Sequence, residues 1–352
     1  MKRNFVLSLM SLGLIFSQMP KASAALLTSY QFNGNGNWSI DGVGSNNTPV
    51  GLLNAIVPTG STIEKAFLYS TTYNNINSSA PIVNFDGTVY TESSWTDLGF
   101  ASTANYLKAY RTDVTSQVLA KVLGGSASPF SFTINEFPNS YTDGEVLAII
   151  YSNPAETYRT IAFLDGNTAA SGDTTTVNFT NPLTSTQLAN PGFDARLSLG
   201  IGFSYQQNGS NQYSTVDVNG QRLTSSAGGS DDGTPENGGL VTVGGIGDNP
   251  ANPTDPNAIP SSNPSAGSRI DDELYTLNPF LHAGDTKIKI DTTNPSYNDN
   301  IFFLGLNITA EAGVNQPAPA KTPESSSVLS LLALGGLGVS ATLKRKKSRK
   351  FA

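Results

Sequence analysis

The sequence predicts an all-β fold, an antiparallel β-sandwich or jelly roll with one or two short helices, between an N-terminal signal peptide and a C-terminal transmembrane helix. Many short runs are rich in β-branched and aromatic residues and are bounded by Gly, Pro, Asn and Asp, which is typical of strands. No long helices alternate with these runs, so we expect antiparallel sheets packed face to face. The runs cover residues 63–73, 81–85, 130–134, 145–151, 158–164, 174–180, 195–206, 286–290 and 301–309.

Two dipeptides between strand-like runs predict tight hairpin turns. Asp86-Gly87 and Asn219-Gly220 are both of the type that supplies the positive φ of such turns. Each dipeptide should therefore join two neighbouring antiparallel strands.

Two stretches predict helices. In TDVTSQVLAKVLGG, Thr112 or Asp113 is a candidate N-cap, the apolar residues fall on one face, and a Gly pair gives the stop. We expect this helix to close one end of the sandwich. The stretch DDELYTLNPFL, residues 271–281, predicts a second short helix.

The N-terminus has the pattern of a secretory signal peptide. Two basic residues precede an apolar core over residues 5–16, and Ala22 and Ala24 form a small-x-small cleavage site. The alternative is an uncleaved membrane anchor, although the apolar run is short for a span. We expect residues 1–24 to be removed on export.

The C-terminus combines an apolar run with a basic tail. Residues 328–343 carry no charge, and the tail at 344–350 holds six basic residues. As a helix, the run would be about 24 Å long, against a hydrocarbon core of about 30 Å, a gap that snorkelling by Lys344 can reduce. Because basic residues stay on the cytoplasmic side, the body of the protein should lie outside.

The segment 324–352 and the residues just before it resemble the PEP-CTERM sorting signal of exported bacterial proteins. That signal is a Pro-Glu-Pro motif, an apolar helix and a basic cluster; here Pro323 and Glu324 are followed by Ser325 in place of the second Pro. The resemblance implies processing at this motif by an exosortase, a membrane-embedded cysteine protease or transpeptidase, in a bacterium that makes extracellular polysaccharide and biofilm. The alternative is a permanent C-terminal anchor.

The body between the two termini is acidic and lacks cysteine. Residues 25–323 hold 11 basic and 26 acidic residues, a net charge of −15, which disfavours nucleic acid as a partner. The absence of cysteine excludes disulfides, cysteine catalysis and thiolate metal sites. We expect a β domain over 25–312 and a Pro-rich linker over 313–323.

Part of the body resembles β-rich domains of bacterial cell-surface proteins whose function is undefined. The resemblance is in the order of KAYRTDVTSQV, FTINE, DGEVLAIIYSNP and YRTIAFLDG. It implies a surface protein and assigns no catalytic residue.

The residues that could support catalysis are few. His282 is the only histidine, and no G-x-S-x-G motif accompanies it, so a serine triad or a zinc site is disfavoured. Paired carboxylates could hydrolyse glycosides, with Glu136, Glu145, Glu156 and Glu273 as the candidates. The alternative is that most of these glutamates are solvated residues at strand ends without a catalytic role.

Calcium is the ligand that the acidic clusters suggest. It takes six to eight oxygen ligands, and Asp271, Asp272 and Asp299 lie beside expected strand ends where such oxygens can converge. The alternative is that Asp and Asn occur there as turn formers.

The sequence thus favours an exported, exosortase-sorted protein of the cell surface or extracellular matrix with a structural or adhesive role, and extracellular polysaccharide as a possible partner. The alternative is a secreted hydrolase of polysaccharide on a jelly-roll scaffold. An enzyme should bring two carboxylates to about 5–9.5 Å in a cleft, beside aromatic platforms.

Overall fold

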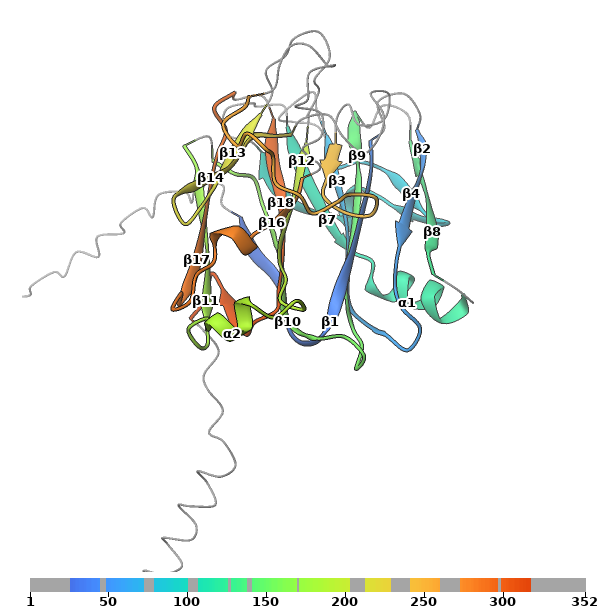
Figure 1. Cartoon of the computed structure of the whole chain (residues 1–352). Coiled ribbons are helices and arrows are strands. Elements are labelled where there is room, and N and C mark those ends of the chain that lie inside the picture. Colours follow the sequence, from blue (N-terminus) through green and yellow to red (C-terminus); the bar gives the residue numbers. More distant parts are fainter. Residues whose placement is uncertain are drawn as a thin grey trace, which may run out of the picture.

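Figure 1 shows the computed structural model of the chain, in which nearly all regular structure is β-strand. None of the helices in the described part of the chain is long and apolar enough to cross a membrane. The predicted signal peptide and the predicted segment 328–343 lie outside the described residues. The structure describes residues 26–44, 49–72, 79–100, 107–125, 128–137, 141–169, 171–202, 213–228, 241–259, 273–296 and 299–317.

The strands form two sandwich units, called unit 1 (residues 36–152) and unit 2 (residues 158–317). Unit 1 also contains the helix α1, Thr115–Gly124, and a 3-10 helix, Glu92–Ser94. Its strands are β1 (Leu27–Gly44, from residue 36), β2 (Val50–Ala55), β3 (Thr62–Thr72), β4 (Val83–Phe85), β5 (Thr88–Tyr90), β6 (Thr96–Phe100), β7 (Lys108–Asp113), β8 (Phe130–Glu136) and β9 (Thr142–Ser152).

Unit 2 follows directly in the chain and also contains the short helix α2, Ser185–Leu188, and a 3-10 helix, Asn278–Phe280. Its strands are β10 (Tyr158–Asp165), β11 (Asp173–Phe179), β12 (Ala195–Gly202), β13 (Ser214–Val218), β14 (Gln221–Ala227), β15 (Val241–Val243), β16 (Leu274–Thr276), β17 (Lys287–Thr293), β18 (Asn300–Ile308) and β19 (Ala312–Val314).

The two units repeat one strand order. The inner sheet of unit 1 runs β1-β9-β3-β7, and that of unit 2 runs β10-β18-β12-β16. The outer sheets run β2-β8-β4-β5 and β11-β17-β13-β14, so each of these eight strands of unit 2 occupies the place of the strand nine earlier. In both units a helix, α1 or the 3-10 helix Asn278–Phe280, precedes the eighth strand. The β domain expected over 25–312 therefore contains a structural repeat that the sequence analysis did not find.

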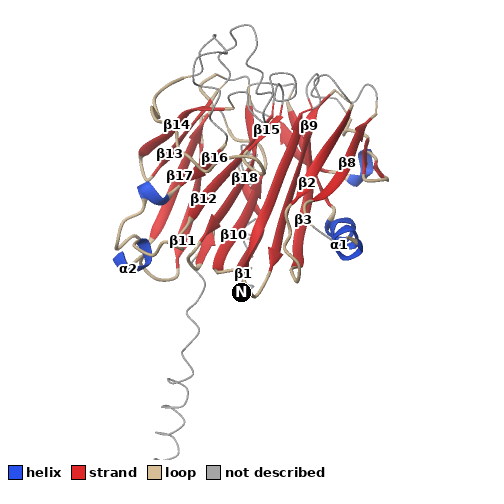
Figure 2. Cartoon of the chain, turned by 45° about the vertical axis from the view of Figure 1, so that its right-hand side comes forward, coloured by secondary structure: helices blue, strands red, loops and turns tan. Residues whose placement is uncertain are grey.

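Three apolar interiors hold four layers of sheet together (Figures 1 and 2). One lies between the outer and inner sheets of unit 1, and a second between those of unit 2. The third lies between the two inner sheets, where Tyr69 of β3 meets Phe303 of β18 with ring centroids 5.1 Å apart. Antiparallel sheets packed face to face confirm the predicted β-sandwich class.

Strand β1 joins the two inner sheets into one hydrogen-bonded sheet. Residues 27–35 pair with β10 of unit 2, and residues 36–44 pair with β9 of unit 1. At the change of partner, a Cβ on Gly36 would lie 2.3 Å from the carbonyl oxygen of Tyr151, so only glycine fits there. The sheet must also fold over itself, because β3 and β18 are four strands apart along it and yet touch.

Both predicted hairpin turns are confirmed. Asp86 and Gly87 have φ of 47° and 89° between β4 and β5, and Asn219 and Gly220 have φ of 51° and 78° between β13 and β14. Positive φ at both central positions is the geometry whose twist matches that of the flanking strands.

The first predicted helix is present and the second is wrong. Helix α1 starts after Val114, with Asp113 accepting a hydrogen bond from the Thr115 amide at 2.9 Å, while Thr112 belongs to β7. It packs on β3 and closes one end of unit 1 (Figure 1). Within 271–281, residues 274–276 form β16 because they pair with β12, and only a 3-10 turn follows.

Candidate functional site

Buried carboxylates gather where the last inner strand of each unit begins. In unit 1 they are Glu136, Asp143 and Glu145, at the end of β8 and the start of β9. In unit 2 they are Glu273, just before β16, and Asp299, just before β18. Since acidic side chains are rarely buried without a partner, these two groups are the strongest chemical features of the described residues.

The carboxylates of unit 1 face each other. Ser70 donates a hydrogen bond to Glu145 Oε1 at 3.1 Å, and Glu145 is fully buried. Burial raises the pKa of Glu145 well above its usual range, and the charge of the adjacent Glu136, to which it is hydrogen-bonded, raises it further. Two carboxyl groups in contact away from water cannot both be ionised at low cost, so the pair holds a proton between them.

The carboxylates of unit 2 are instead surrounded by donors. Glu273 accepts hydrogen bonds from the Gly228 amide at 2.8 Å and from Thr242 Oγ1 at 2.7 Å. Asp299 accepts from Ser296 Oγ at 2.9 Å and from Ser214 Oγ at 3.1 Å. This arrangement satisfies both carboxylates within the protein.

Burial nevertheless raises the pKa of Asp299 to about 6, against the opposing effect of its serine hydrogen bonds. Gly228 lies between the two acids, since a Cβ there would be 3.0 Å from Asp299 Oδ2. The Asp299 carboxylate is therefore held in a closely packed site with no exposed surface.

The predicted calcium ligands are only partly described. Asp271 and Asp272 lie outside the described residues, although Glu273, the next residue, lies near Asp299 around Gly228. No group of three or more His, Asp or Glu residues in the described part of the chain is arranged to hold a metal ion. The calcium site stays a prediction.

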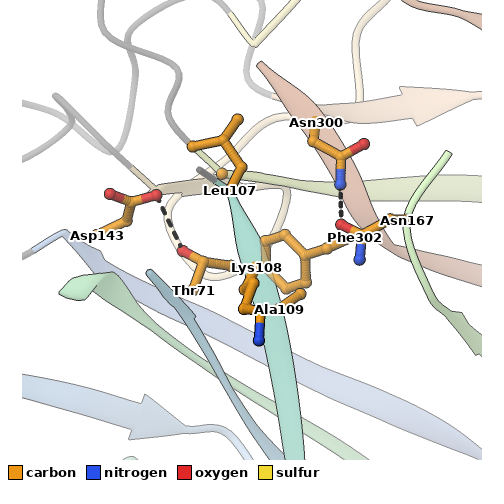
Figure 3. A pocket seen from close by; sticks show the side chains of 9 residues that line it. Thr71, Leu107, Lys108, Ala109, Asp143, Asn167, Asn300 and Phe302 are labelled. Carbon is orange, nitrogen blue, oxygen red and sulfur yellow. Dashed lines mark hydrogen bonds between the residues drawn. The ribbon is translucent and has the colours of Figure 1, made fainter. Parts of the chain in front are cut away.

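A small recess lies at the junction of the two units (Figure 3). In unit 1, Thr71 Oγ1 donates to Asp143 Oδ2 at 3.4 Å, and in unit 2 Asn300 donates to Asn167. The recess has room for about one water molecule. It is lined by Thr71, Leu107, Lys108, Ala109, Asp143, Asn167, Gly202, Asn300 and Phe302.

The four carboxylates considered for glycoside hydrolysis do not form one site. Glu136 and Glu145 converge, but their exposed fractions are 8% and 0%, so no substrate could reach them in this arrangement. Glu156 lies at the β9–β10 connection, at the other end of β9 from Glu145, and Glu273 belongs to unit 2.

The single histidine is an exposed turn residue. His282 precedes the turn into β17, its amide donates to Asp285 Oδ2 at 2.8 Å, and its side chain is 68% exposed. The residues proposed for sorting and cleavage, Ala22, Ala24, Pro323, Glu324 and Ser325, lie outside the described residues.

The sequence analysis named Glu136 and Glu145 separately but did not predict that their side chains are in contact. The two residues end one strand and begin the next, in different sheets of unit 1. Their position at strand ends was visible, but the direction of each side chain depends on which face of its strand is buried. The alternating burial along β8 places Glu136 inside, and that pattern was the available signal.

Comparisons with known proteins give little information about function. No protein-family model matches the chain, and no curated protein is significantly similar to it. One solved structure that is found, the major capsid protein P2 from bacteriophage PM2, is 11% identical, covers 81% of this chain and 98% of its own, and has a TM-score of 0.17. A likeness this weak supports no conclusion about fold or function.

Proposed function

We propose that this chain is an exported, exosortase-sorted protein of the bacterial cell surface or extracellular matrix, with a structural or adhesive role. The observation that carries the proposal is the order of Pro323-Glu324, the uncharged run 328–343 and the six basic residues at 344–350. An apolar run followed by positive charge holds a chain in the membrane with its body outside. Sorting would then release or transfer that body.

The arrangement of the body supports this role. Both units have the strand order expected of a jelly roll, an architecture that pairs most strands and leaves few edges open. The two ends of the body meet, since the Asn315 side chain donates to the Leu26 carbonyl at 3.5 Å and Thr28 donates to the Val314 carbonyl at 3.1 Å. The linker to the sorting segment therefore leaves from a point that the fold holds in place.

The alternative of a polysaccharide hydrolase gains less support. Its best pair of carboxylates, Glu136 and Glu145, is buried and hydrogen-bonded within unit 1. A retaining or inverting mechanism needs both carboxyl groups at a sugar bond, with space for substrate or water between them. We therefore base the proposal on a binding or structural role.

The test is the processing of the tail in the exporting host. Replacing Pro323 and Glu324 together by Ala should leave a longer form in the membrane fraction, because the processing enzyme would lose its motif. Mass measurement of the extracellular and membrane forms reads the outcome. A matched control replaces Ser326 and Ser327 by Ala, which changes neighbouring residues and should leave processing intact. If the Pro323-Glu324 variant is processed like the parent, the apolar run is an ordinary anchor.

A further inference from the structure

The outer sheet of unit 1 exposes apolar side chains on a face whose strands direct no charged side chain outward. The alternation of buried and exposed residues directs one side of β2, β8, β4 and β5 outward. The four strands contain one charged residue, Glu136, and it points inward. We call this surface the apolar face; its large residues, with exposed fractions, are Val50 57%, Leu52 57%, Ile56 49%, Ile82 39%, Val89 47% and Phe137 43%.

The equivalent face of unit 2 has the opposite chemistry. Lys289 pairs with Asp291 at 2.9 Å and Arg222 pairs with Asp217 at 2.6 Å on strands β17, β13 and β14. None of the strongly exposed large hydrophobic residues in the described ranges lies on β11, β13, β14 or β17. Because the two sheets share one strand order, the fold itself does not require the apolar residues of unit 1.

The apolar face is also distant from the chain ends. Strand β19, beside which the two ends meet, belongs to the outer sheet of unit 2. The outer sheet of unit 1 lies at the opposite side of the four layers (Figure 1). On a protein tethered through its C-terminal linker, this face is therefore turned away from the tether.

We propose that the apolar face binds the same face of a second copy of this chain, an inference that rests on the structural or adhesive function proposed above. Elsewhere a body with a net charge of −15 repels its copies, whereas the strands of this face direct no charged side chain outward, and the adjacent Asp86 is neutralised by its ion pair with Lys121. A two-fold contact requires a surface that matches itself. Apolar side chains and neutral Asn, Ser and Thr groups, which donate and accept hydrogen bonds, meet that requirement; the outward polar residues are Asn54, Asn84, Ser131, Thr133 and Asn135.

The size of the face sets the strength of the contact. Strands β2 and β8, of six and seven residues, are roughly 20 Å long, whereas β4 and β5, of three residues each, are roughly 10 Å long. With a spacing of about 4.8 Å between strands, the face covers about 300 Å². Stable interfaces bury about 800 Å² per partner. The contact should therefore be weak in dilute solution and form where copies are concentrated on a surface.

The test uses the full chain in its exporting host, with one cysteine in place of Thr133, which lies on the second strand of the apolar face. The chain has no other cysteine, so any disulfide dimer reports this position. The matched control is Thr174→Cys, an exposed Thr on β11 of the outer sheet of unit 2. After mild oxidation, gel electrophoresis should show several-fold more dimer for Thr133→Cys, both on cells and with the full chain purified in detergent.

A second variant tests the chemistry of the contact. Leu52 pairs with Thr133 across β2 and β8, so Leu52→Asp in the Thr133→Cys chain places two negative charges at the proposed two-fold contact. Leu52 is exposed, so folding and export should be unchanged, and the dimer should fall to the level of the control.

The proposal would be overturned if Thr133→Cys and Thr174→Cys gave equal amounts of dimer, or if the dimer persisted in Leu52→Asp. Processing at Pro323-Glu324 is measured in the same cells, so loss of sorting is distinguished from loss of the contact. If Leu52→Asp reduced retention in the matrix although the Thr133→Cys chain formed no dimer, the face would bind another partner. That result would also overturn the proposal.

Discussion

Each unit buries carboxylates at the start of its last inner strand, and the two units provide for them in different ways. In unit 2, Glu273 and Asp299 receive hydrogen bonds from a backbone amide and from Ser and Thr hydroxyls. In unit 1, Glu145 has one such donor, Ser70, and otherwise contacts another acid, Glu136. The same strand order is therefore compatible with two ways of stabilising a buried carboxylate, by hydrogen-bond donors or by sharing a proton with a second carboxylate.

The strand order places the buried acids in both units, and the groups beside each acid set its protonation. At neutral pH a buried carboxylate with donors keeps its charge, even where burial raises its pKa to about 6 as at Asp299, whereas one beside a second carboxylate gains a proton. The outer faces differ in the same way, since unit 2 carries ion pairs and unit 1 carries apolar residues. The repeat therefore constrains the backbone much more than the surface chemistry.

The largest expected effect comes from the interior that the two units share. Phe303 is fully buried, with ring centroids 5.1 Å from Tyr69 of unit 1 and 5.3 Å from Phe163 of unit 2. Phe303→Ala should lower the free energy of unfolding by about 3–5 kcal/mol, because it removes an aromatic side chain and leaves a cavity. Urea unfolding measures the change, and both units should unfold together.

The matched control for this substitution is Leu123→Ala, at a residue of α1 that is 75% exposed. It should change stability by no more than about 0.5 kcal/mol. Two separate transitions, of which Phe303→Ala shifts only one, would show that the units fold independently and would contradict the shared interior.

The next effect is a pH dependence that originates in unit 2. The pKa of Asp299 is raised from 3.8 to about 6 by burial, so the folded chain holds this proton more tightly than the unfolded chain. Its contribution to stability is complete below pH 3.8 and is lost as the pH rises through 6, by about 3 kcal/mol at about 1.4 kcal/mol per pKa unit. Urea unfolding at pH values from about 4 to about 7, a window that spans the two pKa values, should show this slope.

Asp299→Asn should remove that part of the slope, since an amide does not titrate. The exposed Asp255→Asn removes the same charge without touching a buried group, and it should leave the slope unchanged. An equal slope in Asp299→Asn and the parent would mean that another group causes the pH dependence.

The smallest effects have opposite signs in the two units. At neutral pH, Glu145→Gln should stabilise unit 1 by about 1–2 kcal/mol, because the amide can donate to Glu136 and no longer has to be protonated on burial. Glu273→Gln should destabilise unit 2 by about 1–3 kcal/mol, because its new NH₂ group cannot accept from Gly228 or Thr242. Thermal unfolding of the two variants compares them directly, and a change of the same sign in both would remove the distinction between the units.

Sequence patterns located the strands whose side chains are mostly apolar. The expected runs 63–73, 145–151 and 301–309 correspond to β3, β9 and β18 within a few residues. The long strand β1 was missed because TSYQFNGNGNWSIDGVG is rich in polar residues and glycine. It is a strand because β9 and β10 both pair with it, which no local pattern records.

The sequence by itself determined the features that depend on neighbouring residues. These are the β class, the two positive-φ turns, the helix after β7 and the acidic, cysteine-free character of the body. Each follows from local backbone preference or from composition, so no distant contact is needed.

Only the tertiary structure decided the repeat of two units, the pairing of Glu136 with Glu145, and the approach of Glu273 to Asp299 around Gly228. All three depend on which strands pair and which faces pack together, often between residues far apart in the chain. A strand pattern records that a segment will pair, but its partner is chosen by the packing of whole sheets. For the same reason, the apolar face could be recognised as exposed only once the pairing of the strands and the packing of the inner sheets were known.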